Sequence, residues 1–137
     1  MSATPSDAGS ETEAHSPSSY RILVVDDDPG LMRLVSAILR SAGYTVVTAP
    51  DGNAALEAVQ SDDFDAIVLD LRMPVLDGRG FFRELRASGR TTPVLIASAY
   101  GARDAQLELG AEGAIRKPFE PDALLAAVAK VLDSPPA

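Results

Sequence analysis

Three adjacent acidic residues, Asp26, Asp27 and Asp28, follow the apolar run RILVV and precede a Pro-Gly pair. Neighbouring carboxylates repel one another, and the repulsion costs more where the end of a strand is partly buried. A positive group, either a side chain or a metal ion, is therefore expected beside them. Asp28 comes directly before a proline and a segment of helical periodicity, so we interpret it mainly as a helix cap.

Short apolar runs alternate with segments of helical periodicity between residues 20 and 133. Strands are expected at 21–26, 44–49, 66–71, 93–99 and 113–117. Helices are expected from residue 29, over 52–60, after a turn at 78–80, around 105–109 and from residue 121. Five strands alternating with five helices predict an α/β fold, a doubly wound parallel sheet of (βα)5 type that fills residues 20–133 as one domain.

Polar side chains follow several of these expected strands. Asp70 lies at the end of the third strand, Ser98 at the end of the fourth and Lys117 at the end of the fifth. If the strand order is 2-1-3-4-5, these groups meet the acidic run at one edge of the sheet, where such sheets bind ligands. Carboxylates, a hydroxyl and an ammonium together suit Mg²⁺ and an oxyanion. An aspartate there could act as a nucleophile toward phosphorus.

The overall composition narrows the function classes. The 137 residues carry a formal net charge of −8, which argues against a nucleic-acid partner. There is no cysteine, no secretory signal and no apolar stretch long enough for a membrane helix, so we expect a cytoplasmic protein without membrane contact. Residues 1–19 are rich in Ser, Thr, Pro and Glu and are predicted to be a disordered tail, and residues 134–137 a short C-terminal tail.

Four segments occur in an order that resembles the receiver domains of two-component response regulators. They are LVVDDD (23–28), VLDLRMPVLDG (68–78), VLIASAY (94–100) and KPF (117–119), and the resemblance covers nearly everything after residue 19. It implies a flavodoxin-like fold with strand order 2-1-3-4-5. The chain looks like a single-domain receiver, although a fragment of a longer regulator remains an open alternative.

The resemblance also implies roles for individual residues. Asp70 would accept a phosphoryl group from the phosphohistidine of a histidine kinase or a phosphotransfer protein. Ser98 would be the switch hydroxyl drawn to that group, and Lys117 its ion-pair partner. The bond between Lys117 and Pro118 is expected to be cis. Residues 77–78 are interpreted as no more than a turn.

The same resemblance implies a metal site. Asp26 and Asp27, together with Asp70 and the backbone carbonyl of Arg72, would hold Mg²⁺, with Mn²⁺ as a substitute. Self-phosphorylation and self-dephosphorylation at Asp70 would be the only catalysis.

Three features depart from the family pattern. Ala114 occupies a position where the family often has an aromatic switch residue. The segment between Ser98 and Lys117 is about three residues short, which predicts a shortened fourth helix. Arg72 and Tyr100 are bulky residues that would flank the phosphoryl group, and we expect them to hinder the water that hydrolyses it.

Two other functions remain open. The Asp26-x-Asp28 pair resembles the motif of Mg²⁺-dependent phosphatases with an aspartyl nucleophile, but the residues after it do not match, and we expect no cap domain to build a substrate pocket. A receiver fold that acts as an interaction module without phosphorylation is the second alternative. The leading interpretation is a phosphorylation-controlled receiver that signals to an unknown downstream protein by contact or by onward phosphotransfer.

Overall fold

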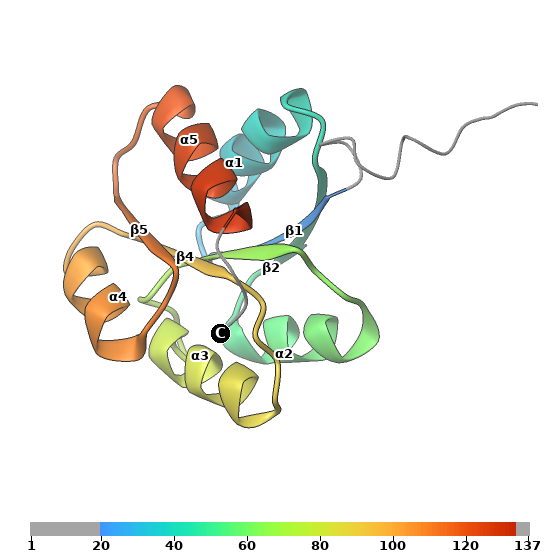
Figure 1. Ribbon diagram of the computed structural model, residues 1–137, viewed down its shortest axis with the longest axis vertical. Coiled ribbons are helices and arrows are strands. Elements are labelled where there is room, and N and C mark those ends of the chain that lie inside the picture. Colours follow the sequence, from blue (N-terminus) through green and yellow to red (C-terminus); the bar gives the residue numbers. More distant parts are fainter. Residues whose placement is uncertain (1–19, 134–137) are drawn as a thin grey trace, which may run out of the picture.

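The computed structural model describes residues 20–133, so both predicted tails, 1–19 and 134–137, lie outside the described residues. Five parallel strands form one sheet in the order β2-β1-β3-β4-β5 (Figure 1). The strands are β1 (Arg21–Val25), β2 (Thr45–Ala49), β3 (Ala66–Leu69), β4 (Val94–Ser98) and β5 (Gly113–Arg116). The helices are α1 (Pro29–Ser41), α2 (Gly52–Ser61), α3 (Gly78–Ala87), α4 (Ala102–Leu109) and α5 (Pro121–Leu132). The predicted flavodoxin-like fold and strand order are confirmed.

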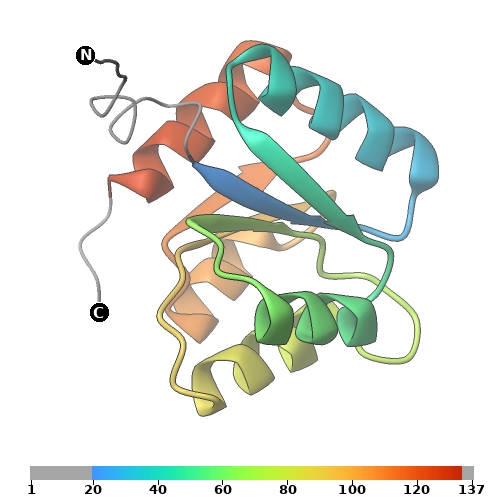
Figure 2. The same cartoon turned by 90° about the vertical axis from the view of Figure 1, so that its right-hand side faces the viewer.

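Helices cover both faces of the sheet. Helices α1 and α5 lie on one face and α2, α3 and α4 on the other (Figures 1 and 2). Successive residues of β1 point to opposite faces, as in any strand, so Leu23 and Val25 pack in one apolar cluster and Ile22 and Val24 in the other. Because both faces are covered, the central strands are continuous apolar runs, and the candidate site residues lie at their ends.

Aspartates begin three of the five helices. Asp28 caps α1 by accepting hydrogen bonds from the amides of Gly30 and Leu31. Asp51 and Asp77 cap α2 and α3 in the same way. Each cap binds otherwise unpaired amides in the first turn and thereby fixes where the helix begins. The interpretation of Asp28 as a helix cap is confirmed.

Helix α4 is the shortest of the five, with 8 residues, as the short segment after β4 predicted. Its N-cap, Gly101, has a left-handed backbone and makes no capping hydrogen bond through a side chain. Ion pairs also connect α3 to α4: Arg79 and Arg83 both contact Glu108 at 3.3 Å. Each of these pairs is partly exposed and contributes about 0–1 kcal/mol.

A more buried ion pair anchors the loop after α4. The guanidinium of Arg86 lies 3.0 Å from Glu112, stacks 4.6 Å from the centroid of the Phe82 ring and donates to the carbonyl of Thr92. Glu112 also accepts the amide of Val94 at the start of β4. Helix α3 is therefore joined to the regions before and after α4.

Several element ends differ from the sequence prediction. Strands β1 and β3 end at Val25 and Leu69, so Asp26 and Asp70 lie just beyond the ladder. Leu71 is buried although it is outside the strand, which is why an apolar run suggested a longer one. Helix α4 begins at Ala102, three residues earlier than expected. None of the helices over residues 20–133 has both the length and the hydropathy needed to cross a bilayer.

Candidate phosphoryl and metal site

The carboxylates of Asp26 and Asp70 are held side by side by the backbone that follows β1 and β3. The Asp26 amide donates to the carbonyl of Ala49, and the Asp70 amide donates to the carbonyl of Val25 at 2.9 Å. Each residue therefore continues the sheet pairing by one hydrogen bond before its chain turns away. Both side chains are nearly buried, with 6% of each residue exposed. Asp27 points to solvent beside them.

These three acids form a compact oxygen cluster. One carboxylate oxygen from each of Asp26, Asp27 and Asp70 lies within 4.8 Å of the other two. Hard divalent cations such as Mg²⁺ prefer such oxygen ligands and need only one or two carboxylates. One Asp26 oxygen already accepts the amide of Asp28 at 2.9 Å, which orients the carboxylate. The donor set fits the predicted cation.

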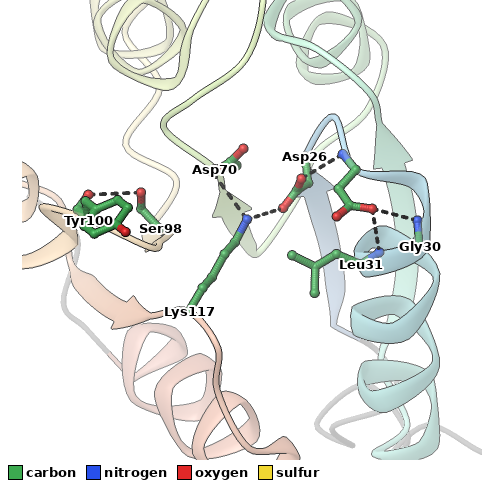
Figure 3. Close-up of polar contacts among 8 residues, drawn as sticks. Asp26, Gly30, Leu31, Asp70, Ser98, Tyr100 and Lys117 are labelled. Carbon is green, nitrogen blue, oxygen red and sulfur yellow. Dashed lines mark hydrogen bonds and ion pairs between the residues drawn. The ribbon is translucent and has the colours of Figure 1, made fainter.

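Lys117 reaches into this cluster from the end of β5. Its Nζ donates to Asp26 Oδ2 at 2.7 Å and to Asp70 Oδ1 at 3.3 Å (Figure 3). The Lys117 amide donates to the carbonyl of Ser98 at 2.9 Å, which fixes the base of the side chain beside β4. The peptide bond to Pro118 is cis, as predicted. The positive group that the acidic run required is therefore present.

The single ammonium does not neutralise the cluster. Burial is the main cause that raises the pKa of Asp70; Lys117 acts against it and the charge of Asp26 adds to it. Burial alone would lower the pKa of Lys117, but the hydrogen bonds and charges of Asp26 and Asp70 outweigh it, so that pKa is raised. A site with surplus negative charge and a nearly buried carboxylate is suited to a cation and to modification of Asp70.

Gly78 supports the loop that carries Asp70. A Cβ atom at this position would overlap the Asp70 carbonyl oxygen and lie 2.7 Å from Leu71 Cα. The Gly78 amide also donates to the carbonyl of Leu71 at 3.0 Å. Residues 77–78, interpreted from the sequence as a turn, thus have two further functions: Asp77 caps α3, and Gly78 allows the helix to approach the Asp70 backbone.

The model of the response regulator receiver domain matches residues 22–129, which is most of the chain. The chain belongs to the response regulator receiver domain family. The acidic cluster and Lys117 are therefore the acidic pocket of a receiver, consistent with phosphorylation of an aspartate. Receivers of this family act in two-component signalling and pair with histidine kinases.

Named relatives agree with this membership. The receiver is 44% identical over 117 residues to the response regulator MprA of Mycobacterium ulcerans, with 83% of this chain and 50% of MprA covered. It is 43% identical over 112 residues to the transcriptional regulatory protein TcrA of Mycobacterium tuberculosis, with 80% of this chain and 44% of TcrA covered. The chain thus spans about half the length of the curated relatives it matches.

Solved structures resemble the receiver over nearly their whole length. The chemotaxis protein CheY4 of Vibrio cholerae is 35% identical with a TM-score of 0.76, and the match covers 82% of this chain and 98% of CheY4. The receiver domain of the sensor histidine kinase PA1611 of Pseudomonas aeruginosa is 34% identical with a TM-score of 0.77, covering 84% of this chain and 98% of that domain. That structure has a magnesium ion coordinated in its active-site cleft.

The remaining residues singled out from the sequence lie around the cluster. The Ser98 side chain is buried and its hydroxyl donates to the carbonyl of Tyr100 at 3.1 Å (Figure 3). The Tyr100 side chain is largely exposed, and together with Arg72 it lines an open hollow beside Asp27. The backbone of Arg72 also forms a hydrogen bond with Asp70. The roles of Ser98, Arg72 and Tyr100 stay predictions.

Sequence reasoning missed one charged residue at this hollow. Arg79, in the first turn of α3, lines it together with Arg72, Asp27 and Tyr100. The available signal was the Asp-Gly turn directly before Arg79, and the structure places the helix turn that follows it beside the Asp70 backbone. Its ion-pair partner, Glu108, is 29 residues away in the sequence, so no local sequence pattern predicts this pair.

Proposed function

We propose that this receiver accepts one phosphoryl group on Asp70 from the phosphohistidine of a histidine kinase or a phosphotransfer protein, and so acts in a two-component phosphorelay. The observation that best supports the proposal is the meeting of three acidic oxygens within 4.8 Å with an ammonium that contacts both Asp26 and Asp70. This arrangement offers a nucleophile, a cation site and a counter-charge in one place.

In the proposed transfer, an oxygen of ionised Asp70 forms a bond to phosphorus while the bond from phosphorus to the donor imidazole nitrogen breaks. The electron pair of that bond stays with the imidazole. Asp26, Asp27 and the backbone carbonyl of Arg72 would hold Mg²⁺, or Mn²⁺ in its place, beside Asp70. When bound, the ion would offset charge on the phosphoryl oxygens. Lys117 would offset the remaining charge as it turns from the Asp26 carboxylate toward the new group.

Ser98 would change its hydrogen-bond partner when Asp70 is phosphorylated, and Tyr100 would help to slow hydrolysis of the aspartyl phosphate. The Ser98 hydroxyl would leave the Tyr100 carbonyl, where it now donates at 3.1 Å, and donate to a phosphoryl oxygen. This exchange would shift the β4–α4 loop between two populations. Arg72 and Tyr100 would hinder in-line attack by water and so slow self-dephosphorylation. Replacing both by small polar residues should shorten the half-life of the phosphorylated receiver; an unchanged half-life would remove this role.

The output would be a contact with a downstream protein or onward phosphotransfer. We propose residues 20–133 as the receiver unit that makes this contact, without nucleic acid or membrane as a direct partner. The acidic net charge of −8 supports this choice of partner.

Incubation with acetyl phosphate and Mg²⁺, followed by intact-protein mass measurement, tests the proposal. The wild type should gain one phosphoryl group, and Asp70→Asn none. Asp63→Asn removes an exposed acid elsewhere and should behave as wild type. Uptake by Asp70→Asn, or by neither protein, would overturn the proposal, and the second result would favour an interaction module. Repeated turnover of small phosphate esters would indicate a phosphatase instead.

A further inference from the structure

An open hollow of about 590 Å³ adjoins the acidic cluster at Asp27, which is one of its lining residues. Three further charged residues, Arg72, Asp77 and Arg79, also line it. A phosphorylated donor that approaches Asp70 from this side meets these residues.

Without a bound cation, the acidic cluster itself repels such a donor. Asp26, Asp27 and Asp70 concentrate negative charge beside the hollow, and Lys117 already donates to two of these carboxylates. Even where Mg²⁺ offsets that charge, a cation that lines the hollow would raise the local concentration of an anionic donor.

Arg79 is suited to this task because its present partner is easily exchanged. Its Nη2 lies 3.3 Å from Glu108 Oε1, and both side chains are partly exposed, at 37% and 50%. Exposed ion pairs of this kind are weak. Glu108 would not be left unpaired if Arg79 moved, because its other oxygen contacts Arg83 Nη2, also at 3.3 Å.

We propose that Arg79 is a binding residue for the phosphoryl oxygens of the incoming donor, and that Glu108 is its resting partner. An anionic donor competes with Glu108 for the guanidinium, whose fork of N–H groups can bind two phosphoryl oxygens at once. This inference rests on the proposed function, since it concerns the donor of the same phosphoryl group.

Arg83 provides a matched control. Arg79→Gln and Arg83→Gln each remove one positive charge from α3 and one ion pair to Glu108, but only Arg79 lines the hollow. Phosphorylation rates are measured over a range of acetyl phosphate concentrations at saturating Mg²⁺. We expect Arg79→Gln to lower the second-order rate constant about fivefold through weaker donor binding, and Arg83→Gln to change it less than twofold. Arg79→Lys should keep part of the rate.

Glu108→Gln tests the resting partner. It should raise the rate about twofold by freeing Arg79, and this gain should vanish in the Arg79→Gln background. Equal rates for Arg79→Gln and Arg83→Gln would overturn the inference while leaving the proposed function intact, provided that circular dichroism shows both proteins to be folded. A wild type that takes up no phosphoryl group would overturn the proposed function, and the inference with it. If Arg79→Gln does not fold, the other two variants test the inference. A reduced rate for Arg79→Lys together with a raised rate for Glu108→Gln would support it, and wild-type rates for both would overturn it.

Discussion

The ammonium of Lys117 lies closer to the carboxylate of Asp26, at 2.7 Å, than to that of Asp70, at 3.3 Å. In this state the cation mainly neutralises the residue that is not the proposed nucleophile. Asp70 therefore has the longer of the two contacts with the ammonium, in a nearly buried position. The same geometry leads to measurable consequences for stability.

Removal of the ammonium should destabilise the metal-free receiver. Lys117→Met leaves two nearly buried carboxylates without a partner, and we expect a loss of about 3 kcal/mol in the free energy of unfolding at neutral pH. Added Mg²⁺ should restore part of the lost free energy of unfolding. Urea unfolding with and without Mg²⁺ measures both effects. Arg116→Met, at an exposed neighbouring position, should change the stability little. Equal losses for the two variants would contradict the importance of the ion pairs.

The raised pKa of Asp70 makes metal-free stability depend on pH. A group whose pKa is higher in the folded than in the unfolded protein stabilises the fold while it is protonated, and this stabilisation is lost as the pH rises through the folded pKa. The melting temperature in chelator should therefore fall as the pH rises above about 4, the unfolded pKa of an aspartate. Lys117 also has a raised pKa, and its contribution should be lost only at alkaline pH.

Asp70→Asn should remove the part of the pH dependence of the metal-free melting temperature that comes from Asp70. The amide carries no charge at any of these pH values, so we expect the metal-free variant to be more stable than wild type at pH 7, by roughly 1 kcal/mol or about 5 °C. Mg²⁺ should stabilise the variant less than wild type because one carboxylate ligand is gone. Melting curves in chelator from pH 4 to 8 check this, with Asp63→Asn as the control. A variant that melts below wild type at pH 7 would contradict the charge argument.

Gly78 should tolerate no side chain. Gly78→Ala places a methyl group against the backbone at Asp70 and Leu71, which cannot move aside as a flexible side chain would. We expect a loss of about 2 kcal/mol or more and slower phosphorylation. Gly30→Ala, where the added Cβ has an ordinary contact at 3.5 Å, should instead gain about 0.5–1 kcal/mol in helix α1. Chemical unfolding of both variants measures the contrast, and a neutral Gly78→Ala would refute the close approach.

Val75 has an unfavourable backbone conformation in the β3–α3 loop. Its φ is 69°, in the left-handed region, and the residue is 93% exposed, so no packing compensates. A β-branched residue rarely adopts this conformation, whereas asparagine tolerates it. Val75→Asn should therefore stabilise the receiver by about 1 kcal/mol. A urea midpoint that stays the same or falls would show that the loop gains nothing from relief of strain.

The fold was predictable because its apolar runs are buried on both faces. The position of Asp70 at a strand end could be predicted for the same reason, since it directly follows such a run and parallel strands end at one edge. The exact ends were not predictable. Leu71 is apolar and buried yet lies outside β3, and the residue before α4, Gly101, has no capping side chain that would mark the start of the helix.

Contacts between distant segments account for the rest. The partner of the Ser98 hydroxyl is a backbone carbonyl, that of Tyr100, and any residue type would offer one. The pairing of Arg79 with Glu108 depends on how α3 and α4 pack, and no periodicity in either helix reports it. A functional group could therefore be predicted where its residue type stands at the end of a strand. A contact that arises only when distant segments pack together could not.

The close approach of Gly78 to Asp70 connects the acidic pocket to the shortened helix α4 through a short chain of contacts. The backbone of Asp70 touches Gly78, one peptide bond leads to Arg79, and one ion pair leads to Glu108 on α4. These contacts form a continuous route from the acidic pocket to α4, and its last step is a weak, partly exposed ion pair. This route bypasses β5, where Ala114 offers no ring to move.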